Sequence, residues 1–490
     1  MATHHAFSTD VIPGTVHLVD LAGTLRVKHE EGGDQAIVLL PQPTTEYDDP
    51  LNWSRRRKLL SAIMGLVAVF SGDVMTTLLS AALLDIESDT GIPLATLNSG
   101  VGVQYLFFGE WYANRVLIGF FYGPIETLVE ICISDVFFAH DRGFWIGMYC
   151  WILFGIPFLG AVPAGSIAQN LGWQWIQFIA SIISAGCVLA MFFLMEETMF
   201  FRPPVQDEVV DVEEDVSDHE NASSDSSPQE KKVAVAPTET EVGVVVTKKT
   251  YMQKLKFWGA RRPGQPNNFF RSVWLPSYML RYPVVTFSGV LVGSVLSWFN
   301  VVNATIALVL AAPPYNFSTN GIGLIFLAPF IGCTIGCIFA GASANRFAVW
   351  MSKRKGGIFE PEYRLWMALW EPNTGVHWVG LAFGLAFIVG TFPIGSAIAI
   401  NHIIDSYREI SGDGLVTMIC IRNAMGFGFS YGVTPWIEAT GVQNTYIAVG
   451  FIGMFFWGLS FLFIVIGKKL RKRNAKNYWG MVEKHGLSAH

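Results

Sequence analysis

The stretch Tyr112–Ser134 reads YANRVLIGFFYGPIETLVEICIS, an almost unbroken apolar run that carries three charged side chains. As an α-helix this run would be about 34 Å long, enough to cross the roughly 30 Å hydrocarbon core of a bilayer. The sequence therefore predicts a membrane-spanning helix here. Its charged residues are expected to face other protein, because lipid does not solvate them.

Nine further runs of this kind make the chain an all-α polytopic membrane protein with about ten predicted spans. Apolar residues make up 51% of the 490 residues and charged residues 15%, against about 25% charged in a typical soluble protein. This composition excludes a disordered or nucleic-acid-binding protein. The ten runs are Leu59–Leu83, Pro93–Gly109, Tyr112–Ser134, Phe144–Ala168, Trp175–Met195, Val284–Ala312, Gly321–Asn345, Val376–Asn401, Asp413–Trp436 and Asn444–Gly467.

Lysine and arginine are distributed unevenly between the loops. Basic clusters lie at 55–58, 353–355 and 468–473, whereas the loops 84–92, 169–174, 313–320 and 437–443 contain neither residue. Because basic loops remain in the cytosol, both termini are expected to be cytosolic.

The ten runs form two groups of five, separated by a long polar segment. We expect a mostly disordered cytosolic tail (1–58), an N-terminal helical bundle (59–198), a cytosolic linker (199–283), a C-terminal bundle (284–467) and a cytosolic tail (468–490). The linker is acidic at first and then basic and aromatic over 251–283. That second part suits either a segment lying on the cytosolic leaflet or a solvated basic linker.

Two bundles joined by a linker are typical of duplicated transporters, and several short motifs carry a closer resemblance. They are Asp49–Ser54 (DPLNWS), Ser134–Gly143 (SDVFFAHDRG), Gly155–Gly165 with its prolines, Leu171–Trp175 (LGWQW), Glu196–Thr198 (EET) and Pro361–Leu365 (PEYRL). With these motifs in this order, the chain resembles fungal transporters of the major facilitator superfamily, in the drug:proton-antiporter-like branch.

This resemblance implies twelve spans in two six-helix halves, alternating access, a small organic substrate, usually proton coupling, and most often the plasma membrane. The third and ninth helices of that pattern are missing here. Gly109 runs directly into Glu110, and the six apolar residues 365–370 would span only about 9 Å. Either two segments were lost from the gene model or transcript, or the chain is a genuine ten-span relative. The first explanation is favoured, because the remaining loops keep a twelve-span charge bias.

The run Tyr112–Ser134 also carries the strongest candidate site. Arg115 and Glu126 are 11 residues apart, about 1100° of helix, so they lie within roughly 20° of one face. Glu130 follows Glu126 one turn later on that face. Ionisable groups in a span cost about 2.5–3.5 kcal/mol or more and usually have a function, here substrate binding or proton transfer. A structural ion pair, or Arg115 reaching to the outer interface, is the alternative.

Other polar residues within the runs are further candidates for substrate binding or proton coupling. Asp73 is a lone carboxylate in the first span, with a helix-packing hydrogen bond as the alternative. Arg422 needs an acidic partner, which Glu126 or Glu130 could supply, and Asn423 lies beside it. The run Val284–Ala312 adds three side chains that either contact a ligand or hold helices together: Trp298, Asn300 and Asn303.

Three charges at predicted cytosolic helix ends, Asp135, Arg142 and Asp405, match gating charges of the resembled family, with solvated loop charge as the alternative. Five Gly-x-x-x-Gly pairs, among them Gly332 and Gly336, allow close helix contact.

The sequence contains no phosphate-binding, metalloprotease, serine-hydrolase, haem or zinc motif. We therefore expect that the protein is not an enzyme and that it binds no cofactor or metal. The six cysteines have no paired spacing. The predicted function is secondary active, proton-coupled transport of a small organic solute, with cationic or polyamine-like cargo favoured by the acids. The expected partners are solute, protons and membrane lipid, with no nucleic acid, and the protein is expected to be a monomer. The alternative is a transporter-like sensor or a non-transporting truncated isoform.

Overall fold

The structure is a computed structural model, and all structural statements below concern the residues that it describes. These are 12–20, 29, 37–44, 46, 48–78, 82–91, 110–200, 269–311, 313, 315–354, 358–362 and 378–485. Within the helices, the side chains of residues 110–118, 269–273, 340–345, 378–383 and a few single positions lie outside the description.

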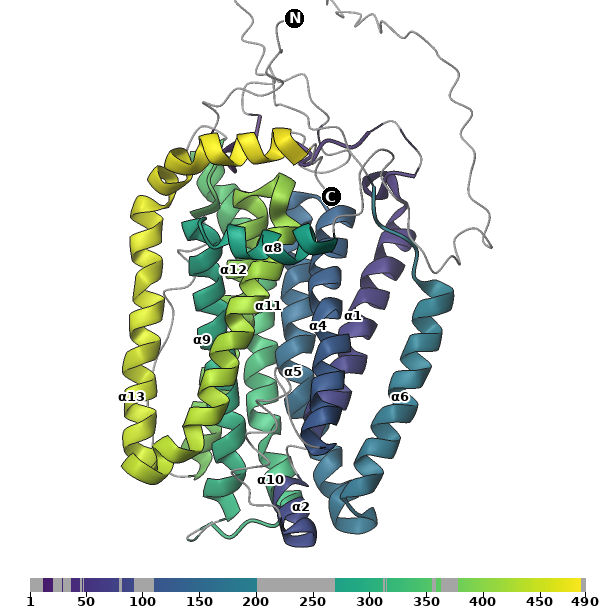
Figure 1. The fold of residues 1–490 in the computed structure, drawn as a ribbon, viewed down its shortest axis with the longest axis vertical. Helices are drawn as coiled ribbons and strands as arrows, with labels where there is room; N and C mark the ends of the chain where they lie inside the picture. Colours follow the sequence, from purple (N-terminus) through teal and green to yellow (C-terminus); the bar gives the residue numbers. More distant parts are fainter. Residues whose placement is uncertain are drawn as a thin grey trace, which may run out of the picture.

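Long helices running side by side form the body of the molecule (Figure 1). The α-helices of the described residues are α1 (Arg55–Thr77), α2 (Leu83–Thr90), α4 (Glu110–Val136), α5 (Ala139–Leu171), α6 (Trp173–Leu194), α8 (Phe269–Met279), α9 (Pro283–Ala311), α10 (Thr319–Ile325), α11 (Leu327–Arg354), α12 (Trp378–Ser406) and α13 (Ser411–His485). Strands β1 (Val16–His17) and β2 (Ile358–Phe359) form one small antiparallel sheet. The predicted all-α polytopic fold is confirmed.

Seven stretches of the described helices are long and apolar enough to cross a membrane, in α1, α5, α6, α9, α10–α11, α12 and α13. The long α13 contains two of the predicted spans. Gly441, with non-helical φ/ψ of 78° and 158°, lies between them and divides the helix into two legs. Helix α4 has 27 residues, about 40 Å of helix. The predicted span Pro93–Gly109, and the residues 363–377 where the ninth helix would be expected, lie outside the described residues.

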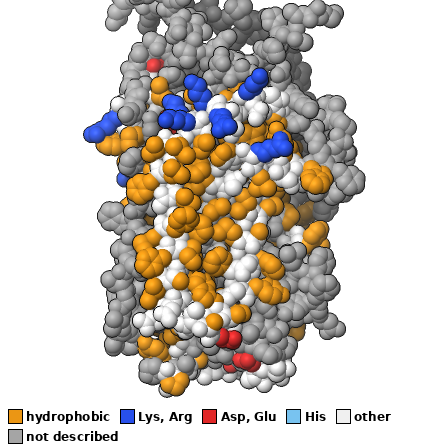
Figure 2. All heavy atoms as spheres, turned by 60° about the vertical axis from the view of Figure 1, so that its left-hand side comes forward, with side chains coloured by type: hydrophobic (Ala, Val, Ile, Leu, Met, Phe, Trp, Pro, Cys, Tyr) orange, Lys and Arg blue, Asp and Glu red, His pale blue; other side chains and the backbone are white. Residues whose placement is uncertain are grey.

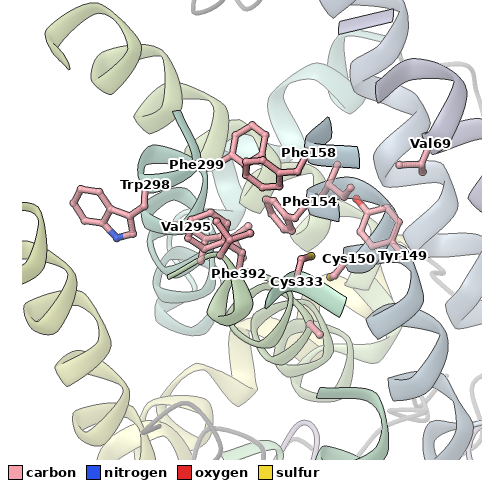
Figure 3. Close-up of a cluster of buried hydrophobic side chains, with 14 of the residues drawn as sticks. Val69, Tyr149, Cys150, Phe154, Phe158, Val295, Trp298, Phe299, Cys333 and Phe392 are labelled. Atoms are coloured by element: carbon pink, nitrogen blue, oxygen red, sulfur yellow. The ribbon is translucent and has the colours of Figure 1, made fainter. Parts of the chain in front are cut away.

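The helices pack as two groups that meet along one interface. Helix α1 packs against α4, α5 and α6, while α13 packs chiefly against α9, and α11 against α12. Between the groups, α5 contacts α10, α11 and α12, and α4 contacts α13. Figure 3 shows the apolar part of this interface, where Phe154 and Phe158 of α5 meet Phe299 of α9 and Phe392 of α12. Aromatic rings in edge-to-face contact thus hold the two halves together.

Two glycines explain how α11 and α12 approach so closely. A Cβ atom at Gly332 would lie 1.8 Å from the carbonyl oxygen of Ala386, and one at Gly336 would lie 1.8 Å from that of Gly390. Any side chain there would collide with the backbone of α12. This Gly-x-x-x-Gly pair therefore serves helix packing within the chain, as predicted.

The two ends of the bundle differ in charge. Figure 2 shows exposed apolar side chains over the middle of one face, Lys and Arg above them, and acidic side chains at the opposite end. Large apolar residues such as Ile182 and Val465 are each 71% exposed, as expected for a surface that contacts lipid. The last turns of α13 also lie at the basic end (Figure 1).

The two tails are more ordered than the sequence indicated. We expected residues 1–58 to be mostly disordered, but residues 12–20 and 37–44 are packed on the basic end of the bundle, with Leu18, Val19, Val38 and Leu40 buried. The predicted C-terminal tail continues α13 as far as His485. These segments pair with residues distant in sequence, and such short stretches give no periodic signal of these contacts.

The predicted linker ends in a helix, α8, which packs against α13. The chain just after this helix is anchored in a cluster with the end of α13, where Met279 and Tyr282 are buried beside Tyr478. Trp274 on the same helix is 72% exposed. An anchored helix with an outward tryptophan is compatible with a segment on the cytosolic leaflet, which stays a prediction.

Candidate functional site

An ion pair between the two halves forms the centre of the site. Arg422 of α13 pairs with Glu126 of α4 through one guanidinium nitrogen, and the two side chains are 5% and 7% exposed. Arg422 also donates to the side-chain oxygen of Asn423, at 3.2 Å from Nε and 3.1 Å from the terminal nitrogen. Of the two partners predicted for Arg422, Glu126 makes the contact.

Asp73 of α1 joins this group through a tyrosine. The hydroxyl of Tyr122 on α4 donates to Asp73 at 2.8 Å, and Asp73 also interacts electrostatically with Glu126 and Arg422. Tyr122 precedes Glu126 by one helical turn, so the two side chains lie on the same face of α4. This tyrosine was not predicted as a site residue, although its i, i+4, i+8 spacing with Glu126 and Glu130 was a usable signal.

Glu130 is the most enclosed member of the site. It is 0% exposed, and neither of its carboxylate oxygens has a hydrogen-bond partner among the described residues. Arg422, Glu126 and Tyr149 of α5 interact with it electrostatically, and the Tyr149 hydroxyl is near but not in hydrogen-bonding geometry. A buried carboxylate without hydrogen bonds is costly in its ionised form. Binding of a proton or a nearby cation would therefore stabilise this buried carboxyl group.

Among the described residues of the site, the carboxyl groups outnumber the guanidinium groups. Asp73, Glu126 and Glu130 all interact with the one guanidinium of Arg422. If all three carboxyl groups were ionised, their charge would exceed that of the arginine by two. Such an excess in a water-excluded setting is relieved by protonation or by binding a positively charged ligand.

Two other predicted site residues, Trp298 and Asn300, make packing contacts with α13. Trp298 packs its ring edge-to-face against Phe429 of α13 and points away from the central rings (Figure 3). Asn300 donates to the backbone oxygen of Gly426 at 3.3 Å, which is the helix-holding alternative. Asn303 is half-buried on the same helix. Arg115 lies on α4, but its side chain is outside the described part of the chain.

A second ion pair joins the halves at the basic end. Arg142 near the start of α5 pairs with Asp405 near the end of α12, and both side chains are 3% exposed. Asp135 is buried at the end of α4. The pairing fits the predicted gating role of Arg142 and Asp405, which stays a prediction together with that of Asp135.

The motifs of the resemblance make contacts at this same end. Asp49 accepts from the backbone nitrogen of Leu51 at 3.0 Å and so caps the short 3-10 helix Pro50–Asn52. Arg57 pairs with Glu196 at 2.5 Å and lies over the ring of Trp53, 3.9 Å from its centroid. These contacts hold the start of α1 against the segment that follows the end of α6.

A cluster around Arg471 at the basic end of the bundle was missed by sequence reasoning. This residue of α13 lies beyond the predicted last span, is fully buried, and donates to Glu360 at 2.6 Å and to Glu362 at 2.7 Å. Burial lowers the pKa of Arg471, but the Glu362 and Glu360 carboxylates outweigh burial and raise it. The only signal in the sequence was the motif Pro361–Leu365, which contains Glu362.

The described residues contain no group of three or more His, Cys, Asp or Glu side chains that could hold a metal ion. The side chains described at the site above carry carboxyl, hydroxyl, amide and guanidinium groups. These can bind a polar solute and exchange protons.

Several known proteins have sequences similar to this chain. The family model described as Major Facilitator Superfamily matches residues 37–360. The chain is 28% identical to the uncharacterized MFS-type transporter C1271.10c of Schizosaccharomyces pombe, covering 96% of this chain and 94% of that protein. It is 24% identical to Protein HOL1 of Saccharomyces cerevisiae, covering 94% and 95%. The two alignments extend over 556 and 567 positions, more than the 490 residues of this chain.

Among solved structures, the human organic anion transporter MFSD10 is similar with a TM-score of 0.37 and 12% identity, covering 87% of this chain and 81% of that one.

Proposed function

This chain belongs to the Major Facilitator Superfamily, and we propose that it is a proton-coupled secondary active transporter of a small organic solute that works by alternating access. The family supports membrane transport as the general function. Proton coupling and the nature of the solute are inferred from the site.

The single observation that carries this proposal is the environment of Glu130. Its carboxyl group is fully enclosed, has no hydrogen-bond partner among the described residues, and shares one arginine with Glu126. A group in this position exchanges a proton for a positively charged solute with little change in net charge. The excess of acids favours a cationic solute such as an amine.

Alternating access follows from where the two inter-half ion pairs lie. The Arg142–Asp405 pair closes the basic end between α5 and α12, whereas Glu126–Arg422 joins α4 to α13. When the halves rock apart at the basic end, the first pair must separate. Protonation of Glu126 or Glu130 weakens the electrostatic attraction of that carboxyl group to Arg422. It therefore lowers the free energy needed to move the two halves apart.

The chain is an integral membrane protein, and we place both termini in the cytosol. Lys and Arg lie at the end of the bundle where α13 ends (Figures 1 and 2), which is the arrangement that basic cytosolic loops produce. We further propose the plasma membrane as its location and the monomer, with lipid around it, as the working unit.

Uptake into liposomes that contain the purified chain tests the proposal. A panel of radiolabelled organic amines is offered with and without a pH gradient, and the wild type is expected to accumulate at least one amine only when the gradient is present. Glu130→Gln should abolish accumulation. Glu438→Gln, an exposed carboxylate on α13, is the matched control and should leave it unchanged. Gradient-independent uptake, or full uptake by Glu130→Gln, would refute proton coupling at this site.

The second candidate is a chain that binds solute without transporting it. It is favoured by the sequence, in which no apolar runs were found for the third and ninth helices of the resembled family, together with the alignments, which are longer than the chain. Sequencing transcripts across Gly109–Glu110 and Leu369–Glu371 separates the two. Recovery of two apolar segments would restore twelve spans, and their absence together with binding but no flux would favour the sensor.

A further inference from the structure

A short N-terminal segment lies across the basic end of the bundle. It consists of residues 12–20 and 37–44, here called the N-terminal strap. Its strand β1 pairs antiparallel with β2, so that Val16 lies opposite Phe359 and His17 opposite Ile358. The backbone nitrogen of Val38 donates to the oxygen of Leu18 at 2.9 Å. A two-residue pair of strands is not stable alone, so other contacts must hold the strap in place.

The strap contacts both halves of the transporter. Its buried side chains form an apolar cluster with Phe359, against which Ala139 of α5 and Val349 of α11 pack. The backbone nitrogen of Ala139 donates to the oxygen of Leu40 at 2.8 Å. The strap therefore binds the first turn of α5 in one half and the loop after α11 in the other.

Arg471 fastens the strap to the C-terminal half. Besides Glu360 and Glu362, its guanidinium donates to the carbonyl oxygen of Pro13 and to the hydroxyl of Thr15 at 3.3 Å. Thr15 in turn donates to Glu360 at 3.0 Å. Since Arg471 is fully buried, these contacts are shielded from water and salt, which strengthens them.

The start of the strap lies directly on a gate residue. Gly14 has a φ of +78°, and a Cβ atom built on it would lie 2.6 Å from the backbone oxygen of Asp405 and 2.8 Å from the Cα of Ser406. Only glycine fits this position without strain. The backbone of the strap thus covers the end of α12, whose Asp405 side chain forms the ion pair with Arg142.

We propose that the N-terminal strap is a second layer of the cytosolic gate, anchored by Arg471, and that it must leave the end of α12 before the transporter opens to the cytosol. A segment that binds α5 on one side and the α11–α12 region on the other resists their separation. The proposal rests on the proposed alternating access. It does not depend on proton coupling or on the solute.

The test measures opening directly. Spin labels on cysteines replacing Asp141 of α5 and Lys353 of α11, in a chain whose six native cysteines are replaced, report the distance between the halves at the cytosolic end. Gly14→Ala places a methyl group against the backbone of Asp405, so it should release the strap and raise the long-distance population at least about threefold. Gly91→Ala has the same positive-φ strain, but nothing lies within 4 Å of its Cβ, and it should change nothing.

A second variant and a cross-link keep the test decisive. Leu18→Asp puts a charge into the apolar cluster and should act as Gly14→Ala does. A disulfide between cysteines replacing His17 and Ile358, which are direct strand partners, should abolish the long-distance population until a reductant is added. Hydrogen exchange over residues 16–20 and 37–40 shows whether the strap has been released. The proposal is overturned if exchange is fast in either variant while the distances stay as in the wild type, or if the disulfide leaves opening unchanged. Absence of amine flux in the wild type would refute the proposed function and leave these distances interpretable.

Discussion

The sharing of one arginine by three carboxylates predicts an asymmetry between two substitutions. Arg422→Met removes the cation that interacts with Asp73, Glu126 and Glu130. Glu126→Gln removes one acid and leaves Arg422 with Glu130 in its vicinity. Breaking a buried ion pair by deleting one partner costs about 3–5 kcal/mol when the other charge is left alone. We expect Arg422→Met to reach that range, and Glu126→Gln to cost about 1.5–3 kcal/mol, the loss of one charge-assisted hydrogen bond.

Unfolding of the purified variants, followed by tryptophan fluorescence in one detergent, measures both free energies. The double variant Glu126→Gln with Arg422→Met should be less destabilised than the sum of the two single variants, because the contact between the two side chains is then removed only once. Glu438→Gln, at an exposed position, should stay within about 0.5 kcal/mol of the wild type. If Glu126→Gln proved as costly as Arg422→Met, the arginine would have a single partner, and the shared-charge account would be refuted.

Three further changes probe single contacts. Tyr122→Phe removes the 2.8 Å hydrogen bond to Asp73, so it should lower the free energy of unfolding by about 1–3 kcal/mol. It should also weaken amine binding in a filter assay. Unchanged binding would exclude Asp73 from the solute site. Gly332→Val would collide with the backbone of Ala386, so we expect little folded protein by size-exclusion chromatography, and a stable monodisperse product would contradict the close α11–α12 approach. Asp405→Asn weakens the ion pair with α5 and should increase labelling of cytosol-facing cysteines by a membrane-impermeant maleimide, whereas unaltered labelling would remove this residue from the gate.

Sequence alone predicted the parts of the fold that depend on apolar length. Runs such as Trp175–Met195 became helices, because a helix satisfies every backbone group within lipid. The pairing of Arg422 with an acid of the other half was also predictable, since a buried arginine requires an anion. Which acid Arg422 binds depends on how α4 and α13 are rotated about their axes. No sequence pattern indicates that rotation.

Other contacts could not be predicted from the sequence. Trp298 and Asn300 were predicted either to contact a ligand or to hold helices together, and their contacts with α13 fit the second alternative. The strap and Arg471 were missed, because their contacts join residues more than 100 positions apart. Such pairings leave no local periodicity.

The most direct test of the central claim is proton release on solute binding, measured in a weakly buffered solution of the purified protein in detergent. The account predicts that an amine that binds the wild type displaces a proton from the acidic group around Arg422, and that Glu130→Gln binds the amine with much less proton release. If amine binding released no protons from the wild type, or released them equally from Glu130→Gln, exchange of solute for proton at this carboxyl group would be contradicted.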